Sequence, residues 1–504
     1  MSRIRTATAL LCLAIALPRS GPAQGYRLRL DTRGQAVAYR GVQLDSIPVS
    51  DTVTSPNGGP ATQDGFAVSC FPGSGYCSFF RPGVQQDARP VTSNADLTVW
   101  GLGVPGLSIH AIARLAGSLS SADPWPGAEP TAQLLETYAQ YAVERFAFQV
   151  GRQTLTTRFG FTGFDGGRLT VRDSRHGLDL TGYGGWGLWR GAVLPVTSPE
   201  LNPLGEFRPP ERTVVAGAGA GWTTSRMDIK LTYQREVDPS VDYFVSERAG
   251  VDAALRPYRG VTLSGGADYD MAQGWWGSAE GTLAYAAPNG RVHASAAVRR
   301  YRPHFDLWTI WGAFSPVPYT AIDASLAVTP IRRLELRASG ERYSFADAEA
   351  ATPLVSVESD GWRFSWDAAY TLPQSLTVRG GYHAEFGPGA SSRGFEGGVT
   401  YSPAEFLTLA LHGGTLNRPL ELRFDESSVR TYGLYAQYRS SSRVRVELDA
   451  SGYSEDRQRP DAAAFSWDQL RVSARVVFVF ASGAELRGLP PAVLQMPRSP
   501  EAAP

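Results

Sequence analysis

Hydrophobic and polar residues alternate one by one along most of this chain. Between positions 443 and 451, for example, the even positions carry valine, leucine and alanine, whereas the odd positions carry arginine, glutamate, aspartate and serine. A period of two indicates a β-strand, because successive side chains of a strand point to opposite faces. Each such segment is predicted to be a strand with one apolar and one polar face. The same alternation occurs at 227–234, 291–299, 333–338 and 376–385.

The spacing of the turns indicates how these strands are arranged. Two-faced strands also build soluble sandwiches, but short turns on one rim and long loops on the other are typical of outer-membrane barrels. After residue 23, no apolar run approaches the roughly 18 residues of a membrane-spanning helix. Short connections are expected near Thr224, Pro257, Asn289, Pro330, Pro373, Pro403 and Ser441, and longer ones near Pro239, Ala272, 303–316, 347–352, 387–390, 417–427 and 455–464.

The number of strands follows from this alternation. A bacterial barrel of this kind has an even number of strands and both chain ends in the periplasm. The hairpins from residue 211 onward give 15 strands, and seven more are predicted upstream. The best count is therefore 15 + 7 = 22 strands, and the expected range is 16 to 22. We therefore predict an all-β fold: a single transmembrane, antiparallel, up-and-down β-barrel with short periplasmic turns and long extracellular loops. The seven upstream strands are predicted at 34–45, 95–103, 106–118, 132–143, 146–157, 167–173 and 176–195.

The two ends of the chain differ from the predicted barrel. Arg3 and Arg5 precede an apolar run of about a dozen residues and then small residues, which is typical of a secretory signal peptide cleaved after Ala23. We assign residues 1–23 to the signal peptide and residues 24–480 to the barrel. The proline-rich tail, 481–504, is expected to be a flexible periplasmic extension.

One segment inside the predicted barrel, 46–92, is aperiodic and rich in Gly, Pro, Ser and Asn. It contains Cys70 and Cys77, which we expect to form a local disulfide across a turn, because exported proteins favour disulfides. Two free thiols are the alternative. Strand parity places the segment on the extracellular side, where it either caps or enters the lumen or forms a compact surface loop.

Composition excludes several classes of function. Lys and Arg number 48 and so do Asp and Glu, which argues against a nucleic-acid binder. Removal of Arg3, Arg5 and Arg19 with the signal peptide leaves 48 − 3 = 45 basic residues against 48 acidic ones. The six histidines form no HExxH motif, and no GxSxG elbow or P-loop is present. We expect no enzymatic activity, no cofactor and no metal site.

The polar faces of the predicted strands supply the candidate site, which is the lining of the lumen. In the five alternating segments these faces carry eight basic and five acidic residues, which predicts a mild preference for anions. The predicted lumen residues are Asp228, Lys230, Arg291, Arg299, Arg333, Glu335, Arg337, Arg379, His383, Glu385, Arg443, Arg445, Glu447 and Asp449.

The segment within 132–167 resembles the early hairpin of Gram-negative outer-membrane porin-like barrels, including the alginate-export type. In that family a strand with spaced tyrosines turns into a strand with a Gly-Arg-Gln element. The resemblance implies a barrel that lets solutes cross the outer membrane, with Arg152 on the lumen side. The matching positions are Glu136, Tyr138, Tyr141, Gly151, Arg152, Gln153, Phe164, Asp165 and Gly166.

The final predicted strand also resembles a known signal. The alternating residues from Val472 to Phe480 are similar to the aromatic-ended signal read by the barrel-insertion machinery, although the chain continues after Phe480. We therefore expect partners in outer-membrane lipid, the insertion machinery and small polar solutes, and leave homo-oligomerisation open.

These features favour a porin-like channel for passive diffusion of small polar or anionic solutes, in the outer membrane of a Gram-negative bacterium. One alternative is a non-conducting barrel that anchors surface loops for adhesion or assembly. Another is a secreted carbohydrate-binding β-sandwich.

Overall fold

The computed structural model describes residues 25–482, except 55–58, 65, 72, 121–130, 189–212, 238, 240–243, 303–317, 347–359, 388–391, 419–425 and 460–466. The predicted signal peptide and nearly all of the predicted periplasmic tail lie outside the described residues. No helix in the described part of the chain is long and apolar enough to cross a membrane.

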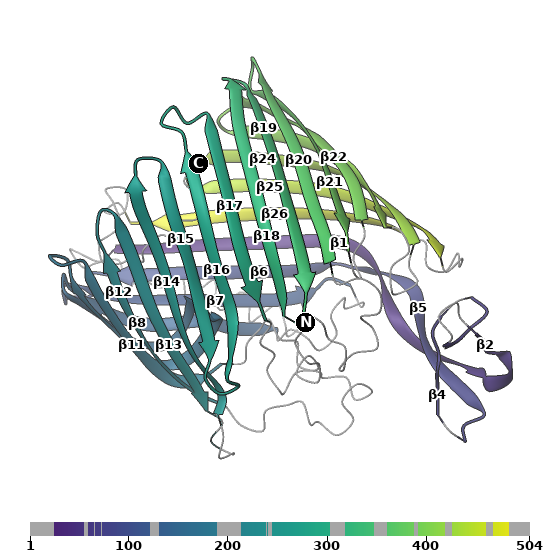
Figure 1. Cartoon of the computed structure of the whole chain (residues 1–504), viewed down its shortest axis with the longest axis horizontal. Coiled ribbons are helices and arrows are strands. Elements are labelled where there is room, and N and C mark those ends of the chain that lie inside the picture. The colour runs from purple at the N-terminus through teal and green to yellow at the C-terminus, as the bar shows by residue number, and fades with distance from the viewer. Residues whose placement is uncertain are drawn as a thin grey trace.

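A closed antiparallel β-barrel forms the body of the molecule (Figure 1). The main sheet has 24 strands, of which β4 and β5 lie outside the wall, so the wall contains 24 − 2 = 22 strands. The wall begins with β1 (Gly25–Pro48), which pairs with both the next wall strand and the last strand, β26. The prediction of an all-β barrel with 22 strands is confirmed.

The other wall strands follow in chain order. They are β6 (Pro90–Trp100), β7 (Leu107–Ser118), β8 (Ala132–Ala142), β9 (Phe146–Thr157), β10 (Gly160–Asp173), β11 (Leu178–Gly187), β12 (Val214–Thr223), β13 (Met227–Val237), β14 (Phe244–Tyr258), β15 (Val261–Asp270), β16 (Trp275–Ala286), β17 (Val292–Tyr301), β18 (Tyr319–Ile331), β19 (Leu334–Phe345), β20 (Asp360–Leu372), β21 (Leu376–Phe386), β22 (Ser392–Ala404), β23 (Leu407–Arg418), β24 (Glu426–Ser441), β25 (Val444–Arg459) and β26 (Trp467–Ala481).

The two rims of the barrel differ as predicted. On the rim where β1 starts and β26 ends, connections are short, for example 259–260, 332–333 and 442–443. On the opposite rim most connections are longer, such as the stretch between β11 and β12. One connection on this long-loop rim consists only of Arg158 and Phe159, between β9 and β10.

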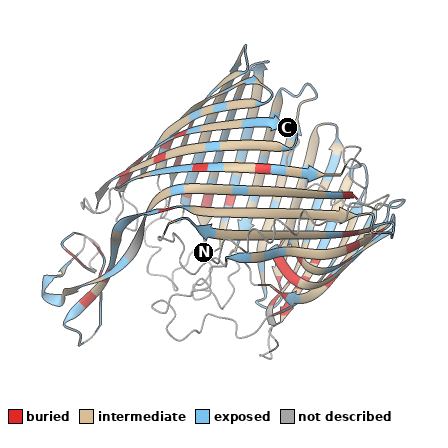
Figure 2. Ribbon diagram, turned by 180° about the vertical axis from the view of Figure 1, so that it is seen from behind, coloured by how far each residue is buried: buried red, intermediate tan, exposed pale blue. Residues whose placement is uncertain are grey.

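The wall strands present their apolar residues outward. Leu231, Ile322 and Phe395 are 51%, 63% and 64% exposed, although they lie in the middle of strands. Next to the short turns, Phe406 and Tyr438 pack edge to face with ring centroids 6.0 Å apart. Most of the wall is intermediate or exposed, and buried stretches are short (Figure 2). The side chains pack in one layer around a wide lumen rather than in a dry core.

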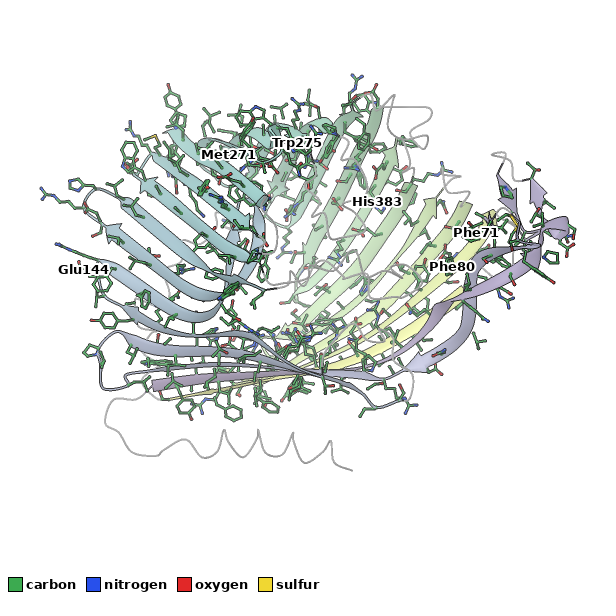
Figure 3. All side chains as sticks on the ribbon, turned by 90° about the horizontal axis from the view of Figure 1, so that it is seen from below. Phe71, Phe80, Glu144, Met271, Trp275 and His383 are labelled. Atoms are coloured by element: carbon green, nitrogen blue, oxygen red, sulfur yellow. A yellow bond between two sulfur atoms is a disulfide. The ribbon has the colours of Figure 1, made fainter. Side chains whose placement is uncertain are left out.

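The segment 46–92 contains more strand than the sequence indicated. Beyond Val37, β1 leaves β26 and pairs with β5 (Tyr76–Ala88), and this two-stranded ribbon forms an arm that projects beyond the rim (Figures 1 and 3). The predicted strand at 34–45 falls within β1 and spans a register shift between Arg40 and Val42, whereas β5 was not predicted, because Pro82, Gly83 and the polar run 85–87 break its alternation.

The tip of the arm has its own small core. It contains the 3-10 helix η1 (Val49–Asp51) and the short strands β2 (Val53–Thr54), β3 (Pro60–Ala61) and β4 (Ser69–Cys70). The predicted disulfide between Cys70 and Cys77 is present. Cys77 is fully buried and packs in a cluster with the buried side chains of Phe66, Val68 and Phe79. The disulfide and this cluster hold the tip against one face of the arm.

Candidate functional site: the lumen and its inward hairpin

Most of the predicted lumen residues lie on the face of the wall opposite to the exposed apolar side chains. Asp228 and Lys230, for example, share a face of β13 with the buried Thr232 and Gln234, whereas Leu231 points outward. By the same alternation, the lumen face carries Asp228, Lys230, Arg299, Glu335, Arg337, Arg379, His383, Glu385, Arg445, Glu447 and Asp449.

Three predicted lumen arginines lie instead at the short-turn rim. The backbone carbonyls of Arg291, Arg333 and Arg443 accept hydrogen bonds at the ends of neighbouring strands, at 2.8 Å in each case. They therefore border one entrance of the barrel and do not line its middle.

Arg152 lies on the outer face, which differs from the lumen position that the resemblance implied. It shares a face of β9 with Phe148 and Val150, and Val150 is 50% exposed. Its guanidinium donates to both carboxylate oxygens of Asp165, at 2.8 and 3.0 Å, and to the carbonyl of Leu134. The alternation along β9 places Arg152 on the outer side of the wall, and Asp165 neutralises its charge there.

Ion pairs connect lumen charges into ladders across neighbouring strands. Glu341 pairs with both Arg299 and Arg363, and Arg363 Nη1 lies 3.2 Å from a Glu341 oxygen. Arg363 Nε then donates to Glu385 at 2.7 Å, and the Tyr343 hydroxyl donates to the same carboxylate at 3.0 Å. Because acids neutralise the arginines within the ladder, an excess of basic residues in the sequence does not translate directly into a positive lumen.

A second ladder crosses the seam where the barrel closes. Arg475 on β26 donates to both carboxylate oxygens of Asp31 on β1, at 2.7 and 2.5 Å. Its other partner is Glu447 on β25, at 3.1 Å, and Glu447 also pairs with Arg445 at 2.9 Å. A bidentate charged pair is directional, so it reinforces the pairing that the backbone hydrogen bonds make between the first and last strands.

The closure of the sheet and the character of its two faces identify the architecture. The sheet closes on itself, its outer face is apolar, and its inner face is charged, as in β-barrels that span a membrane. The protein is an outer-membrane β-barrel.

The hairpin β9–β10 departs from this wall toward the lumen. The β8–β9 ladder stops at Thr137–Arg152, and the β10–β11 ladder stops at Phe164–Gly187, whereas β9 and β10 stay paired to the turn. At Gly151, φ is +129°, and a Cβ atom there would lie 2.2 Å from the Thr137 carbonyl oxygen. Glycine is therefore needed where the hairpin leaves the wall.

Arg158 at the tip of this hairpin connects it to the lumen face of distant strands. The side chain is 6% exposed, and its Nη1 atom lies 2.5 Å from Asp252 on β14 and 3.3 Å from Glu280 on β16. Its Nε atom lies 3.4 Å from Asp268 on β15, and Nη2 donates to Ser278 at 2.9 Å. One arginine thus faces three carboxylates, which hold the tip against the lumen face of β14 to β16.

Apolar and neutral polar contacts also support the hairpin. Phe164 is fully buried and stacks on Tyr183 of β11, with ring centroids 5.5 Å apart, beside the buried Val215 of β12. Gln234 on the lumen face of β13 accepts hydrogen bonds from Thr162 at 3.3 Å and from Tyr183 at 3.0 Å. The hairpin therefore narrows the lumen as a packed, defined element.

Arg158 was not predicted from the sequence to be a functional residue. The predicted strands at 146–157 and 167–173 left it in a connection spanning 158–166, whereas β10 begins at Gly160 and the turn consists only of Arg158 and Phe159. The carboxylates around Arg158 lie 94 to 122 residues further along the chain, so no local pattern connects them. In the described part of the chain, no group of His, Cys, Asp and Glu has metal-binding geometry.

No protein-family model and no curated protein sequence matches this chain. Among solved structures, it is similar to OpdK of Pseudomonas aeruginosa with vanillate, at 11% identity, over 91% of this chain and 99% of that chain, with a TM-score of 0.40. It is also similar to a BenF-like porin from Pseudomonas fluorescens Pf-5, at 10% identity, 90% and 99% coverage and a TM-score of 0.39. At such values these likenesses assign neither a solute nor a residue role to this chain.

Proposed function

We propose that the protein is a porin-like channel through which small polar solutes, anions included, diffuse passively across the outer membrane. The observation that carries this proposal is a closed barrel with a charged lumen face, narrowed by a packed hairpin. Polar lumen side chains support solvation of the passage, and the hairpin sets its width.

The composition of the lumen refines the expected selectivity. Ladders neutralise Arg299 and Arg445, whereas three carboxylates surround the single guanidinium of Arg158. We therefore propose that any anion preference is weak, because the narrowed region contains more acidic than basic groups. The final strand, β26, is proposed to be recognised by the barrel-insertion machinery.

The test is single-channel conductance of the mature chain, refolded in detergent and reconstituted in a planar bilayer. Heat-modifiable migration on a gel first establishes that the barrel is folded. Stepwise current with weak ion selectivity supports the diffusion channel. A folded barrel that inserts and passes no current refutes it.

A second candidate function rests on the arm. Phe71, Tyr76 and Phe80 are 67%, 59% and 53% exposed there, and Figure 3 shows Phe71 and Phe80 on the side of the molecule where the arm projects. Exposed aromatic side chains on a projecting ribbon favour surface attachment or assembly by a non-conducting barrel. The conductance experiment separates the two candidates. The closed barrel excludes a two-sheet carbohydrate-binding sandwich.

A further inference from the structure

A pocket on the lumen wall lies apart from the inward hairpin. It has a volume of about 360 Å³ and crosses strands β19 to β24. Its ionisable lining consists of Glu335, Arg337, Asp367, Arg379, Glu396 and His412. Both signs of charge are therefore present within one small cavity.

The strand register explains why the pocket has an open floor. Gly381 on β21 lies directly between Asp367 on β20 and Glu396 on β22, all on the lumen face. Gly381 has no side chain, and a Cβ atom there would lie 2.4 Å from Asp367 Oδ1. The Asp367 carboxylate thus leans over the glycine, in space that any other residue would occupy.

Arg379 completes the charged set. It precedes Gly381 by two residues on the same strand, so it lies on the same face and diagonal to both Asp367 and Glu396. Diagonal neighbours in an antiparallel sheet are about 7–8 Å apart. This spacing places the guanidinium beside the carboxylates without forcing contact.

Three charges of the pocket are available to a solute. Within the described residues, Asp367, Arg379 and Glu396 have no ion-pair partner within 4.0 Å, whereas Arg337 pairs with Glu335 at 2.5 Å. Unpaired charges of opposite sign on one wall attract a solute that carries both signs. A simple anion at Arg379 would face two carboxylates, and a simple cation at Asp367 would face a guanidinium.

We propose that this pocket binds a small zwitterion, with its carboxylate on Arg379 and its ammonium group on Asp367 and Glu396. This inference rests on the proposed diffusion channel and specifies a class of solute for it. A solute with both charges satisfies both signs of the wall, because planar guanidinium and carboxylate groups pair bidentately. Transient binding on the wall raises the local concentration of zwitterions and their rate of passage.

The test is swelling of liposomes that contain the folded protein. L-serine, a zwitterion, and erythritol, an uncharged solute of similar size, are compared in the same vesicles. The native chain is expected to pass serine about threefold faster than erythritol, because only serine uses the charged wall. In Arg379→Gln and in Asp367→Asn, the two rates should become equal while erythritol passage is unchanged.

Arg445→Gln is the matched control, because Arg445 also lies on the lumen face but pairs with Glu447 outside the pocket. This variant should keep the preference for serine. Heat-modifiable migration on a gel first establishes that each variant is folded. If Arg379→Gln does not fold, Asp367→Asn alone tests the pocket. Equal passage of both solutes by the native chain would overturn the zwitterion site and leave the channel intact. Passage of neither solute would overturn both.

Discussion

At the scale of single residues, the surroundings decide what a charged side chain does in this barrel. Arg152 and Arg158 are six positions apart, yet Arg152 pairs with Asp165 on the outer face, whereas Arg158 faces three carboxylates inside. Arg379 is on the lumen face and has no ion-pair partner among the described residues. The same residue type therefore anchors a hairpin, balances an outward acid or stays available to a solute.

Replacement of Arg158 by glutamine should release the tip of the hairpin from the wall strands β14 to β16. The loss of this shared partner costs about 1–3 kcal/mol, because Asp268 is left largely buried without its counter-ion whereas Asp252 and Glu280 remain about half exposed. We expect single-channel conductance to rise roughly twofold and cation preference to increase, because three carboxylates then face the passage uncompensated. Arg299→Gln, which alters a ladder on the wall, is the control and should change conductance little. A native-like conductance in Arg158→Gln would show that the hairpin does not limit the passage.

At the scale of elements, two hairpins depart from the regular wall in opposite directions. The β9–β10 hairpin bends into the lumen from Gly151, and the β1–β5 arm leaves the barrel beyond Val37. The inward hairpin packs on strands of the wall, whereas the arm carries its own core around Cys77 and Phe79. A mutation in one of these elements is therefore expected to leave the structure of the other unchanged.

Gly151→Ala should disturb the root of the inward hairpin. A non-glycine residue at this positive φ costs about 1–3 kcal/mol, and its Cβ atom would collide with the Thr137 carbonyl oxygen. We expect noisier open-channel current and an unchanged thermal midpoint of the barrel. Gly340→Ala is the matched control, because no heavy atom lies within 4 Å of a Cβ atom there. Equal noise in both variants would contradict this assignment to Gly151.

Loss of the disulfide should affect only the arm. The bridge joins residues separated by seven positions, and closing so short a loop stabilises the tip by about 2–3 kcal/mol. The double variant Cys70→Ser and Cys77→Ser should be cleaved faster by chymotrypsin after Tyr76 or Phe80, which are exposed aromatic residues of β5 on the arm. Conductance should equal that of the native chain. A changed conductance would show that the arm contributes to the passage.

At the scale of the whole molecule, closure of the barrel depends on the seam between the first and last strands. The backbone ladder between β1 and β26 runs from Arg27–Ala481 to Val37–Arg471. Arg475 adds a bidentate pair with Asp31 at the middle of this ladder. The two ends of the chain, more than 400 residues apart, thereby become neighbours.

Arg475→Ala should lower the stability of the barrel by about 1–2 kcal/mol, because Asp31 and Glu447 lose a shared partner that is partly buried. The measurement is the midpoint of urea unfolding, followed by the gel shift between folded and unfolded forms. Arg337→Ala removes a more exposed pair with Glu335 and should change the midpoint by under about 1 kcal/mol. Equal effects of the two variants would refute a special role for the seam.

The sequence by itself predicted most of the wall strands, their number and the rim on which most turns lie. It placed the first strand at 34–45, whereas β1 begins at Gly25, and it placed the start of β10 at 167 and not at Gly160. Period-two alternation is a property of consecutive residues, so stretches such as 443–451 reveal a two-faced strand without reference to the rest of the chain. Counting strands and turns then gave 22, and the disulfide followed from the spacing of Cys70 and Cys77. The arm was missed as a ribbon because β5, which contains Pro82, Gly83 and a polar run from Gln85 to Asp87, lacks the period-two alternation.

Only the tertiary structure decided which element narrows the lumen and which charges pair. Arg158 meets Glu280 because the β9–β10 hairpin packs along the lumen face of the neighbouring strands as far as β16, although 122 residues separate the two side chains in sequence. The pocket around Gly381 arises from the register of three strands, which places Asp367 and Glu396 on either side of it. Local alternation specifies a face, but contacts across a closed sheet depend on register and curvature, which are properties of the whole barrel.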